Sequence, residues 1–306
     1  MIEFLNLLAG TVALRPYVFV FLTVYLVAAC AHMGWRRALC FIPLGYFVAW
    51  ASEFCSIRWG FPYGMYYYID STAGRELWVA GVPFMDSISY VFLSYCSYAT
   101  AIFLMSPLAA VKGEPLALET RAVRRGRSTL ILAALLCVML DIVIDPVALQ
   151  GYRWFLGQIY GYSEQGIYFG VPLSNFVGWL VVALALVSLL QALDRCRWLD
   201  GKPPVRGAGF LQTGLLGPLL YLGILVFNLS VTFHIGDNSL GVSSAFLIFY
   251  TILMTFMWSR YKIKQFNPET ILRHVEDFPH SRAAALLGKQ DWKRGDYFPQ
   301  GGFPER

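Results

Sequence analysis

Long stretches of apolar residues, separated by shorter polar connections, dominate the pattern of the chain. Seven of these stretches each have about the 20 residues that a helix needs to span the hydrocarbon core of a bilayer. The helices expected from this pattern cover roughly residues 15–33, 38–56, 84–106, 128–149, 172–193, 212–233 and 240–259. The sequence therefore predicts an all-α, polytopic membrane bundle over residues 1–260, followed by a cytoplasmic tail of mixed order over residues 261–306.

The composition supports this interpretation. Only 14% of the residues are charged and 57% are hydrophobic, whereas a soluble domain carries about 25% charged residues. The six cysteines lie on apolar segments or at their ends, and none forms a CxxC or CxxH pair. Their spacing therefore indicates neither a metal site nor a disulfide framework.

The basic residues predict the orientation of the bundle. Of the 24 Lys and Arg residues, all but Arg15, Arg58, Arg75 and Arg153 fall in alternate connections and in the tail. Because positive charge accumulates on the cytoplasmic side, we expect an external N-terminus and a cytoplasmic C-terminus. The net positive charge then reflects topology and contact with membrane lipids, and does not indicate binding of nucleic acid.

With this orientation, most of the polar residues of the helices fall in their outer halves. They are Glu53, Asp86, Asp141, Asp145, Asn175, Asn228 and His234. A charge at bilayer depth costs a few kcal/mol, so such side chains usually face the interior of the bundle or a cavity. The pattern predicts a single polar pocket in the outer half of the bundle.

Asp141 and Asp145 are four residues apart, so on a helix they lie on one face. We expect Pro146 to stop this helix and to loosen the turn before it, because its ring frees the carbonyl of Ile142. The Asp145 carboxyl could then turn into the pocket, with Asp141 one turn deeper.

A short internal repeat places further polar residues beside this pair. Residues 81–86 read GVPFMD and residues 170–175 read GVPLSN, and each motif follows a loop rich in glycine and aromatic residues. Each loop follows a helix with an acid near its outer end, Glu53 or Asp145. Two helical hairpins, formed by predicted helices 2–3 and 4–5, would bring these groups together if a pseudo-twofold axis related them.

Several of these residues also have a purely structural interpretation. Asp86 and Asn175 could stabilise exposed N–H groups at a helix start. Glu53 could pair with Arg58, and His234 could be a surface residue. Tyr and Trp side chains also concentrate at membrane interfaces. The structural interpretation is weakest for the two acids at 141 and 145, since predicted helices 2–7 offer no Lys or Arg at that depth.

Acids among aromatic side chains in an apolar pocket can protonate an alkene. A carboxyl group there favours its neutral form, and aromatic faces stabilise a carbocation. The candidate catalytic residues are Asp145, Asp141, Glu53 and Asp86. The candidate substrate-binding residues are Asn175, Trp59, Tyr63, Tyr66, Tyr68, Tyr168, Trp179, Asn228 and His234.

Five segments carry a family resemblance. Residues 53–64 (EFCSIRWGFPYG), the YYY run at 66–68, GVP at 81–83, LDIVIDP at 140–146 and GIYFGVPLSNFVGW at 166–179 resemble membrane-embedded carotenoid-biosynthesis proteins. That family includes acyclic carotenoid hydratases that act on bisanhydrobacterioruberin-type and γ-carotene-type end groups.

The resemblance implies a hydro-lyase reaction that adds water to a terminal isoprenoid double bond, without a metal or organic cofactor. It also implies a lipid-soluble polyene substrate, a bacterial or archaeal inner membrane, and other membrane enzymes of carotenoid synthesis as partners.

Acidic residues inside a membrane bundle could also serve other functions. A polyene cyclase or isomerase would use the same acid chemistry, and a lipid carrier or transporter could have internal repeats with acids inside the membrane. A retinal photoreceptor would need a Schiff-base lysine in the last helix, and residues 240–259 contain none.

The charge distribution makes a first testable prediction. A reporter fused after Arg306 should be cytoplasmic, and one inserted near Ser163 should be external. Alkaline phosphatase and fluorescent-protein fusions measure the two sides. The opposite pattern would place the acids near the inner face of the membrane.

Overall fold

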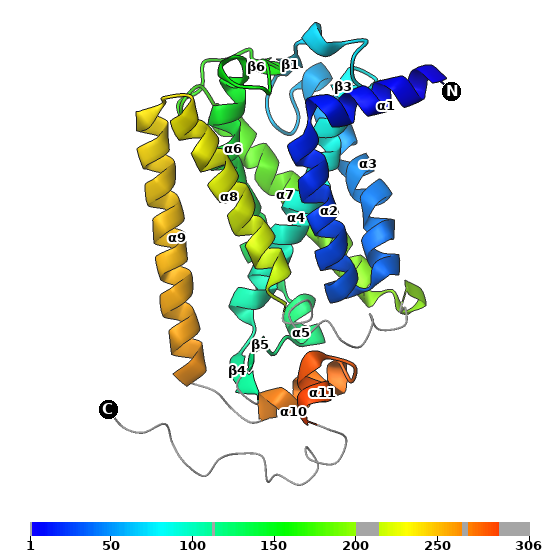
Figure 1. Cartoon of the computed structure of the whole chain (residues 1–306), viewed down its shortest axis with the longest axis vertical. Helices are drawn as coiled ribbons and strands as arrows, with labels where there is room; N and C mark the ends of the chain where they lie inside the picture. The colour runs from blue at the N-terminus through cyan, green and yellow to red at the C-terminus, as the bar shows by residue number, and fades with distance from the viewer. Residues whose placement is uncertain (1, 112–113, 200–213, 265–268, 288–306) are drawn as a thin grey trace.

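A computed structural model describes residues 2–111, 114–199, 214–264 and 269–287 of the chain. Long helices run along the long axis of the molecule (Figure 1). Seven of the described helices are long and apolar enough to cross a membrane, which confirms the polytopic all-α bundle. They are α2 (Pro16–Met33), α3 (Trp35–Trp59), α4 (Phe84–Met105), α6 (Arg127–Leu149), α7 (Leu173–Arg195), α8 (Leu216–His234) and α9 (Asn238–Lys264).

Three features differ from the sequence-based expectation. Helix α1 (Ile2–Leu14) precedes the first span, and α3 and α9 extend several residues beyond their expected ends. The expectation that Pro146 stops its helix is wrong, because α6 continues through this proline to Leu149. In an apolar environment, ending a helix would leave more backbone groups unsatisfied than keeping a proline inside it.

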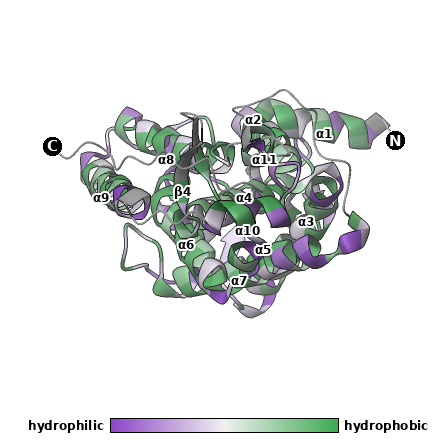
Figure 2. Ribbon diagram, turned by 90° about the horizontal axis from the view of Figure 1, so that it is seen from below, coloured by the Kyte–Doolittle hydropathy of each residue, from purple (hydrophilic) through white to green (hydrophobic). Residues whose placement is uncertain are grey.

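Helix α4 is the centre of the bundle. All of its residues from Tyr90 to Ile102 are buried, and α2, α3, α6, α7 and α8 pack around it. Its buried Ser94, Ser97 and Thr100 donate their hydroxyl protons to carbonyls of the preceding turn. These short side chains let neighbouring helices approach closely while leaving no polar atom unpaired. Seen from below, the ribbons of the packed helices are mainly hydrophobic (Figure 2).

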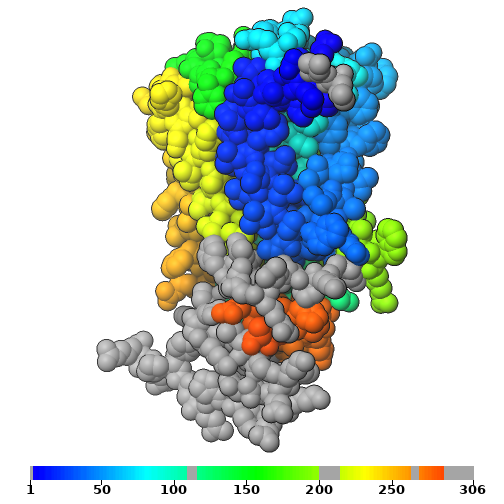
Figure 3. Space-filling model, turned by 45° about the vertical axis from the view of Figure 1, so that its right-hand side comes forward, coloured from blue at the N-terminus to red at the C-terminus, as the bar shows by residue number. Residues whose placement is uncertain are grey.

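One end of the bundle, at the top of Figure 1 and here called the upper end, is formed by the connections after α3 and α6. Strand β1 (Tyr66–Tyr68) pairs antiparallel with β6 (Tyr160–Tyr162), and β2 (Trp78–Val79) pairs with β3 (Val82–Pro83). Two 3₁₀ turns, η1 (Asp70–Thr72) and η2 (Gly151–Arg153), complete these connections. In the space-filling view, α1 and the connection after α3 cover this end above α2 and α3 (Figure 3).

The opposite, lower end contains a second small hydrophobic cluster. The elements at this lower end are β4 (Leu108–Val111), β5 (Glu114–Ala117), α5 (Arg121–Arg124), η3 (Arg197–Leu199), α10 (Glu269–Asp277) and α11 (Arg282–Leu287). Ile271 and Val275 of α10 pack with Leu116 and Leu118 and with Ala283 of α11. The part of the tail that the structure describes beyond α9 is therefore helical and packed against the connection after α4.

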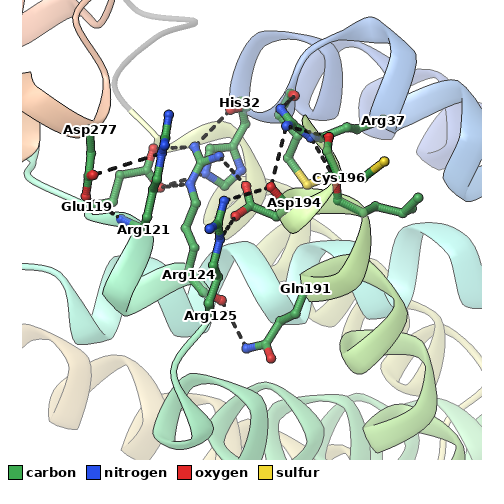
Figure 4. Close-up of polar contacts among 12 residues, drawn as sticks. His32, Arg37, Glu119, Arg121, Arg124, Arg125, Gln191, Asp194, Cys196 and Asp277 are labelled. Carbon is green, nitrogen blue, oxygen red and sulfur yellow. Dashed lines mark hydrogen bonds and ion pairs between the residues drawn. The ribbon is translucent and has the colours of Figure 1, made fainter. Parts of the chain in front are cut away.

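A buried ionic cluster holds the lower end together (Figure 4). The Arg124 guanidinium lies 2.6 Å from Glu119 and 3.3 Å from Asp194, and Arg125 lies 2.6 Å from the second oxygen of Asp194. His32 contacts Glu119 at 2.8 Å. Burial opposes ionisation, yet Arg124 and His32 hold the pKa of Glu119 well below its ordinary value. The cluster thus ties α2, α5 and α7 to one another.

The cluster predicts a large loss of stability when its central cation is removed. Arg124→Gln would leave the buried Asp194 and the half-buried Glu119 without this partner, which typically costs about 3 kcal/mol or more. Thermal unfolding in detergent should show a clearly lower midpoint for this variant. Arg197→Gln is the matched control, because Arg197 is exposed. Equal midpoints for the two variants would show that the cluster does not stabilise the fold.

Candidate functional site

A cavity with about 940 Å³ of empty space, part of it open to the surroundings, lies within the upper half of the bundle. It is enclosed by α2, α3, α4, α6, α7, α8 and the β1–β6 ribbon. Its polar lining includes Glu53, Asp86, Asp141, Asp145, Asn175 and Asn228. Its aromatic lining includes Tyr17, Phe21, Tyr63, Tyr66, Tyr68, Tyr90, Phe92, Trp154, Tyr160, Tyr162 and Trp179. Four carboxyl groups from three helices therefore face one aromatic space.

The first pair of acids lies on α6. Asp141 is 1% exposed and Asp145 is 7% exposed. Asn175, in the first turn of α7, donates from its Nδ2 to Asp141 at 2.8 Å and to Asp145 at 3.0 Å. One amide group with two protons thus holds both carboxyls, which explains why an amide follows the GVP motif here.

Two tyrosines of β6 complete the surroundings of Asp145. The hydroxyl of Tyr162 donates to Oδ2 at 2.5 Å, and the hydroxyl of Tyr160 donates to Oδ1. Together with Asn175, these groups supply three hydrogen bonds to one carboxyl. Donors placed in this way stabilise the carboxylate that remains after Asp145 has given up a proton.

The second pair joins Glu53 of α3 to Asp86 of α4. The hydroxyl of Tyr68 lies 2.6 Å from Asp86 and 3.2 Å from Glu53, and Ser87 donates to the other oxygen of Glu53. A hydroxyl carries one proton, so it can donate to only one of these carboxyls at a time. Both contacts are satisfied when Asp86 accepts from Tyr68 while a protonated Glu53 donates to it. The geometry fits one proton and one negative charge on this pair.

A buried ion pair lies beside the second pair of acids. Arg15, at the start of α2, is 1% exposed and contacts Glu76 at 3.2 Å. It also donates to the carbonyl of Leu156, a residue that lines the cavity. The charges of Arg15 and Glu76 both act on Asp86. The Asp86 side of the cavity therefore has a buried ion pair, with no net charge, near it.

Close packing places a stacked aromatic pair in the cavity wall. The rings of Tyr90 and Trp179 lie 4.4 Å apart and are inclined by 4°. A Cβ atom at Gly178 would come within 2.6 Å of the Cα of Tyr63, which lies in the connection after α3. Only glycine therefore allows α7 to approach this connection so closely. The Gly178–Trp179 sequence thus serves the site by bringing this indole against the tyrosines.

The structure does not bring every candidate residue to the cavity. Trp59 is 70% exposed, and His234 is also exposed. Neither these two nor the half-buried Tyr168 belongs to the lining. Asn228 lines the cavity, and its amide donates to its own helix at Ile224. Arg58, expected as a possible partner of Glu53, lies instead over the ring of Phe54.

Other lining residues were not among the candidates. Tyr160 and Tyr162 belong to a short alternating YGY segment, but nothing in the sequence shows that it pairs with the YYY segment of the other loop. Burial raises the pKa of both hydroxyls, with Asp145 as a further cause, so they stay neutral. Within the described parts of the chain, no three His, Cys, Asp or Glu side chains are placed to hold one metal ion.

Comparison with known proteins agrees with the family resemblance. The family model described as "Carotenoid biosynthesis protein" matches residues 10–237, which include the first six spans and all the acids of the cavity. No curated protein and no solved structure matches the chain. Because the match covers well over half of the sequence, this chain belongs to the carotenoid biosynthesis protein family.

Proposed function

We propose that the protein is a carotenoid hydratase, which adds water to a terminal isoprenoid double bond of an acyclic or monocyclic carotenoid. The observation that carries this proposal is the convergence of two pairs of acids on one aromatic cavity among membrane-spanning helices. The family supports a carotenoid substrate. The acids support chemistry that begins and ends with proton transfer.

The lining of the cavity suits an isoprenoid end group. Its walls combine aromatic rings with the aliphatic side chains of Leu93, Ile144 and Ile224. Such a surface accepts a hydrocarbon chain, and the few polar groups fix the position of its reactive double bond.

In the proposed first step, Asp145 delivers its proton to the terminal double bond. A tertiary carbocation forms, and Asp145 becomes a carboxylate. Tyr160, Tyr162 and Asn175 stabilise that carboxylate by three hydrogen bonds. Asp141 shares the amide of Asn175 and so holds the reacting carboxyl in place. These donors lower the energy of the state that follows transfer, so a buried acid remains strong enough to act.

In the second step, water captures the carbocation and loses a proton to the second pair. Asp86 is the proposed acceptor, because the Tyr68 hydroxyl lies 2.6 Å from its Oδ2 and can stabilise its negative charge. The stacked Tyr90 and Trp179 pair can offer one outer aromatic face to the cation before capture, worth up to about 2 kcal/mol when desolvated. One alkene and one water give one tertiary alcohol, and the protein neither gains nor loses a proton in total.

The orientation of the bundle is also part of the proposal. We place the upper end, with the cavity, outside and the lower end in the cytoplasm, as the distribution of Lys and Arg favours. Residues 261–306 would then form the cytoplasmic tail, whose described part comprises the last turn of α9 and residues 269–287 with α10 and α11.

Product analysis tests the reaction. Expression in bacteria that make lycopene or γ-carotene should yield a pigment heavier by one water, measured by mass spectrometry. An isobaric pigment with a changed retention time would show a cyclase or isomerase instead. Unchanged pigments would remove the hydratase proposal and favour a carrier.

Asp145→Asn tests the proton donor. The amide keeps the shape of the side chain but has no acidic proton, so conversion should fall by about 100-fold or more. The variant should still insert and retain carotenoid on purification. Asp70→Asn is the matched control, because Asp70 is an exposed acid at the same end of the bundle. Conversion at the wild-type rate by well-expressed Asp145→Asn would remove this residue from the mechanism.

Asp141→Asn and Glu53→Gln test the supporting acids. Each should lower conversion by about 10-fold or more, since each carboxyl helps to hold a neighbour that reacts. Circular dichroism and yield separate this effect from misfolding. If both variants convert normally, the two pairs of acids do not act as units.

A further inference from the structure

The proposed reaction changes the protonation of two acids in the cavity. After each turnover Asp145 has lost a proton and Asp86 has gained one. Before the next turnover, a proton has to return to Asp145. This inference rests on the proposed function and concerns the path of that return.

The β1–β6 ribbon lies between the two pairs of acids. Its register places Tyr66 opposite Tyr162 and Tyr68 opposite Tyr160. Alternate residues of a strand share a face, so Tyr66 and Tyr68 lie on one face of β1 and line the cavity. Tyr67, on the other face, is 52% exposed.

Hydroxyl contacts lead from each pair of acids onto this ribbon. At one end, the Tyr68 hydroxyl contacts Asp86 at 2.6 Å, and the Tyr66 hydroxyl donates to Tyr68 at 3.3 Å. At the other end, Tyr160 and Tyr162 both donate to Asp145. Each acid that changes its protonation is therefore bonded directly to a tyrosine of the ribbon.

The remaining gap lies between Tyr66 and the tyrosines of β6. The ring of Tyr66 is 6.3 Å from that of Tyr160 and 6.2 Å from that of Tyr162, centre to centre. The proposed reaction requires water in the cavity, and one such water can connect hydroxyls that do not contact each other directly.

The chemistry of these hydroxyls suits proton transfer. A phenol group can accept one proton while it donates another, so a row of such groups can pass a proton without any of them becoming charged for long. Burial, together with Asp86 and Glu53, raises the pKa of Tyr66 and Tyr68, which keeps both neutral.

We propose that Tyr68, Tyr66, Tyr160 and Tyr162 form a relay that returns a proton from Asp86 to Asp145 after each hydration. Asp86 gives its proton to the oxygen of Tyr68 as Tyr68 passes its own proton to Tyr66. Tyr66 passes one through the bridging water to Tyr160 or Tyr162, and that tyrosine protonates Asp145. No net charge moves out of the site, and both acids return to their starting states.

Tyr66→Phe tests the relay, because it removes only the middle hydroxyl and keeps the ring. The first turnover needs no return of a proton, so it should proceed at close to the wild-type rate. Later turnovers should slow by at least about 10-fold. Rapid-quench measurement of hydrated carotenoid per protein, in vesicles loaded with γ-carotene, should then show a burst of one product per chain. Tyr67→Phe, on the exposed face of the same strand, should show no burst.

The possible outcomes separate the relay from the hydratase proposal. A burst in Tyr66→Phe with an unchanged unfolding temperature supports the relay. Later turnovers at the wild-type rate would overturn it, since the proton would then return directly from solvent. An equal loss in the first and later turnovers would also overturn it, because Tyr66 would then act in folding or substrate binding. Absence of any hydrated product from the wild type would instead refute the proposed function.

Discussion

The burial of four carboxyl groups among membrane-spanning helices is the constraint on which the rest of this structure depends. Lipid offers no hydrogen bonds, so every such group has to find its partners within the protein. The amide of Asn175 holds Asp141 and Asp145, and hydroxyl groups hold the other pair. These partners come from the loops and helix starts at one end of the bundle, which explains why that end is built so differently from the other.

The two ends of the bundle stabilise their buried acids with different kinds of partner. At the lower end, Arg124 and Arg125 neutralise Glu119 and Asp194, so the charges there are paired and fixed. In the cavity, the acids are bonded mainly to hydroxyl and amide groups, which can stabilise either protonation state. Arg15 acts on Asp86 only through space, and its own ion pair is with Glu76. Paired charges suit stability, whereas neutral partners leave the acids free to exchange protons.

Much of the fold could be predicted from the sequence, because membrane spans depend on length and apolarity alone. The polar residues of the spans also pointed to a shared cavity, since apolar surroundings leave so few places for them. The pairing of Tyr66 with Tyr162 could not be predicted, because it joins loops almost a hundred residues apart through backbone hydrogen bonds. The burial of Arg15 was missed for a similar reason: its partner Glu76 belongs to a distant loop, and a lone Arg before a span looks like an interfacial residue.

The ribbon also bears on the internal repeat. Strands β1 and β6 come from equivalent positions in the two GVP-containing hairpins, and they pair antiparallel around Tyr67 and Gly161. A twofold axis through this point would produce such a pairing, so the ribbon agrees with a pseudo-twofold arrangement. The two halves differ where the motif ends, with Asp86 in one and Asn175 in the other. An amide cannot accept a proton from water at neutral pH, whereas a carboxylate can. In the proposed mechanism, this difference suits Asn175 to hold an acid and Asp86 to act as a base.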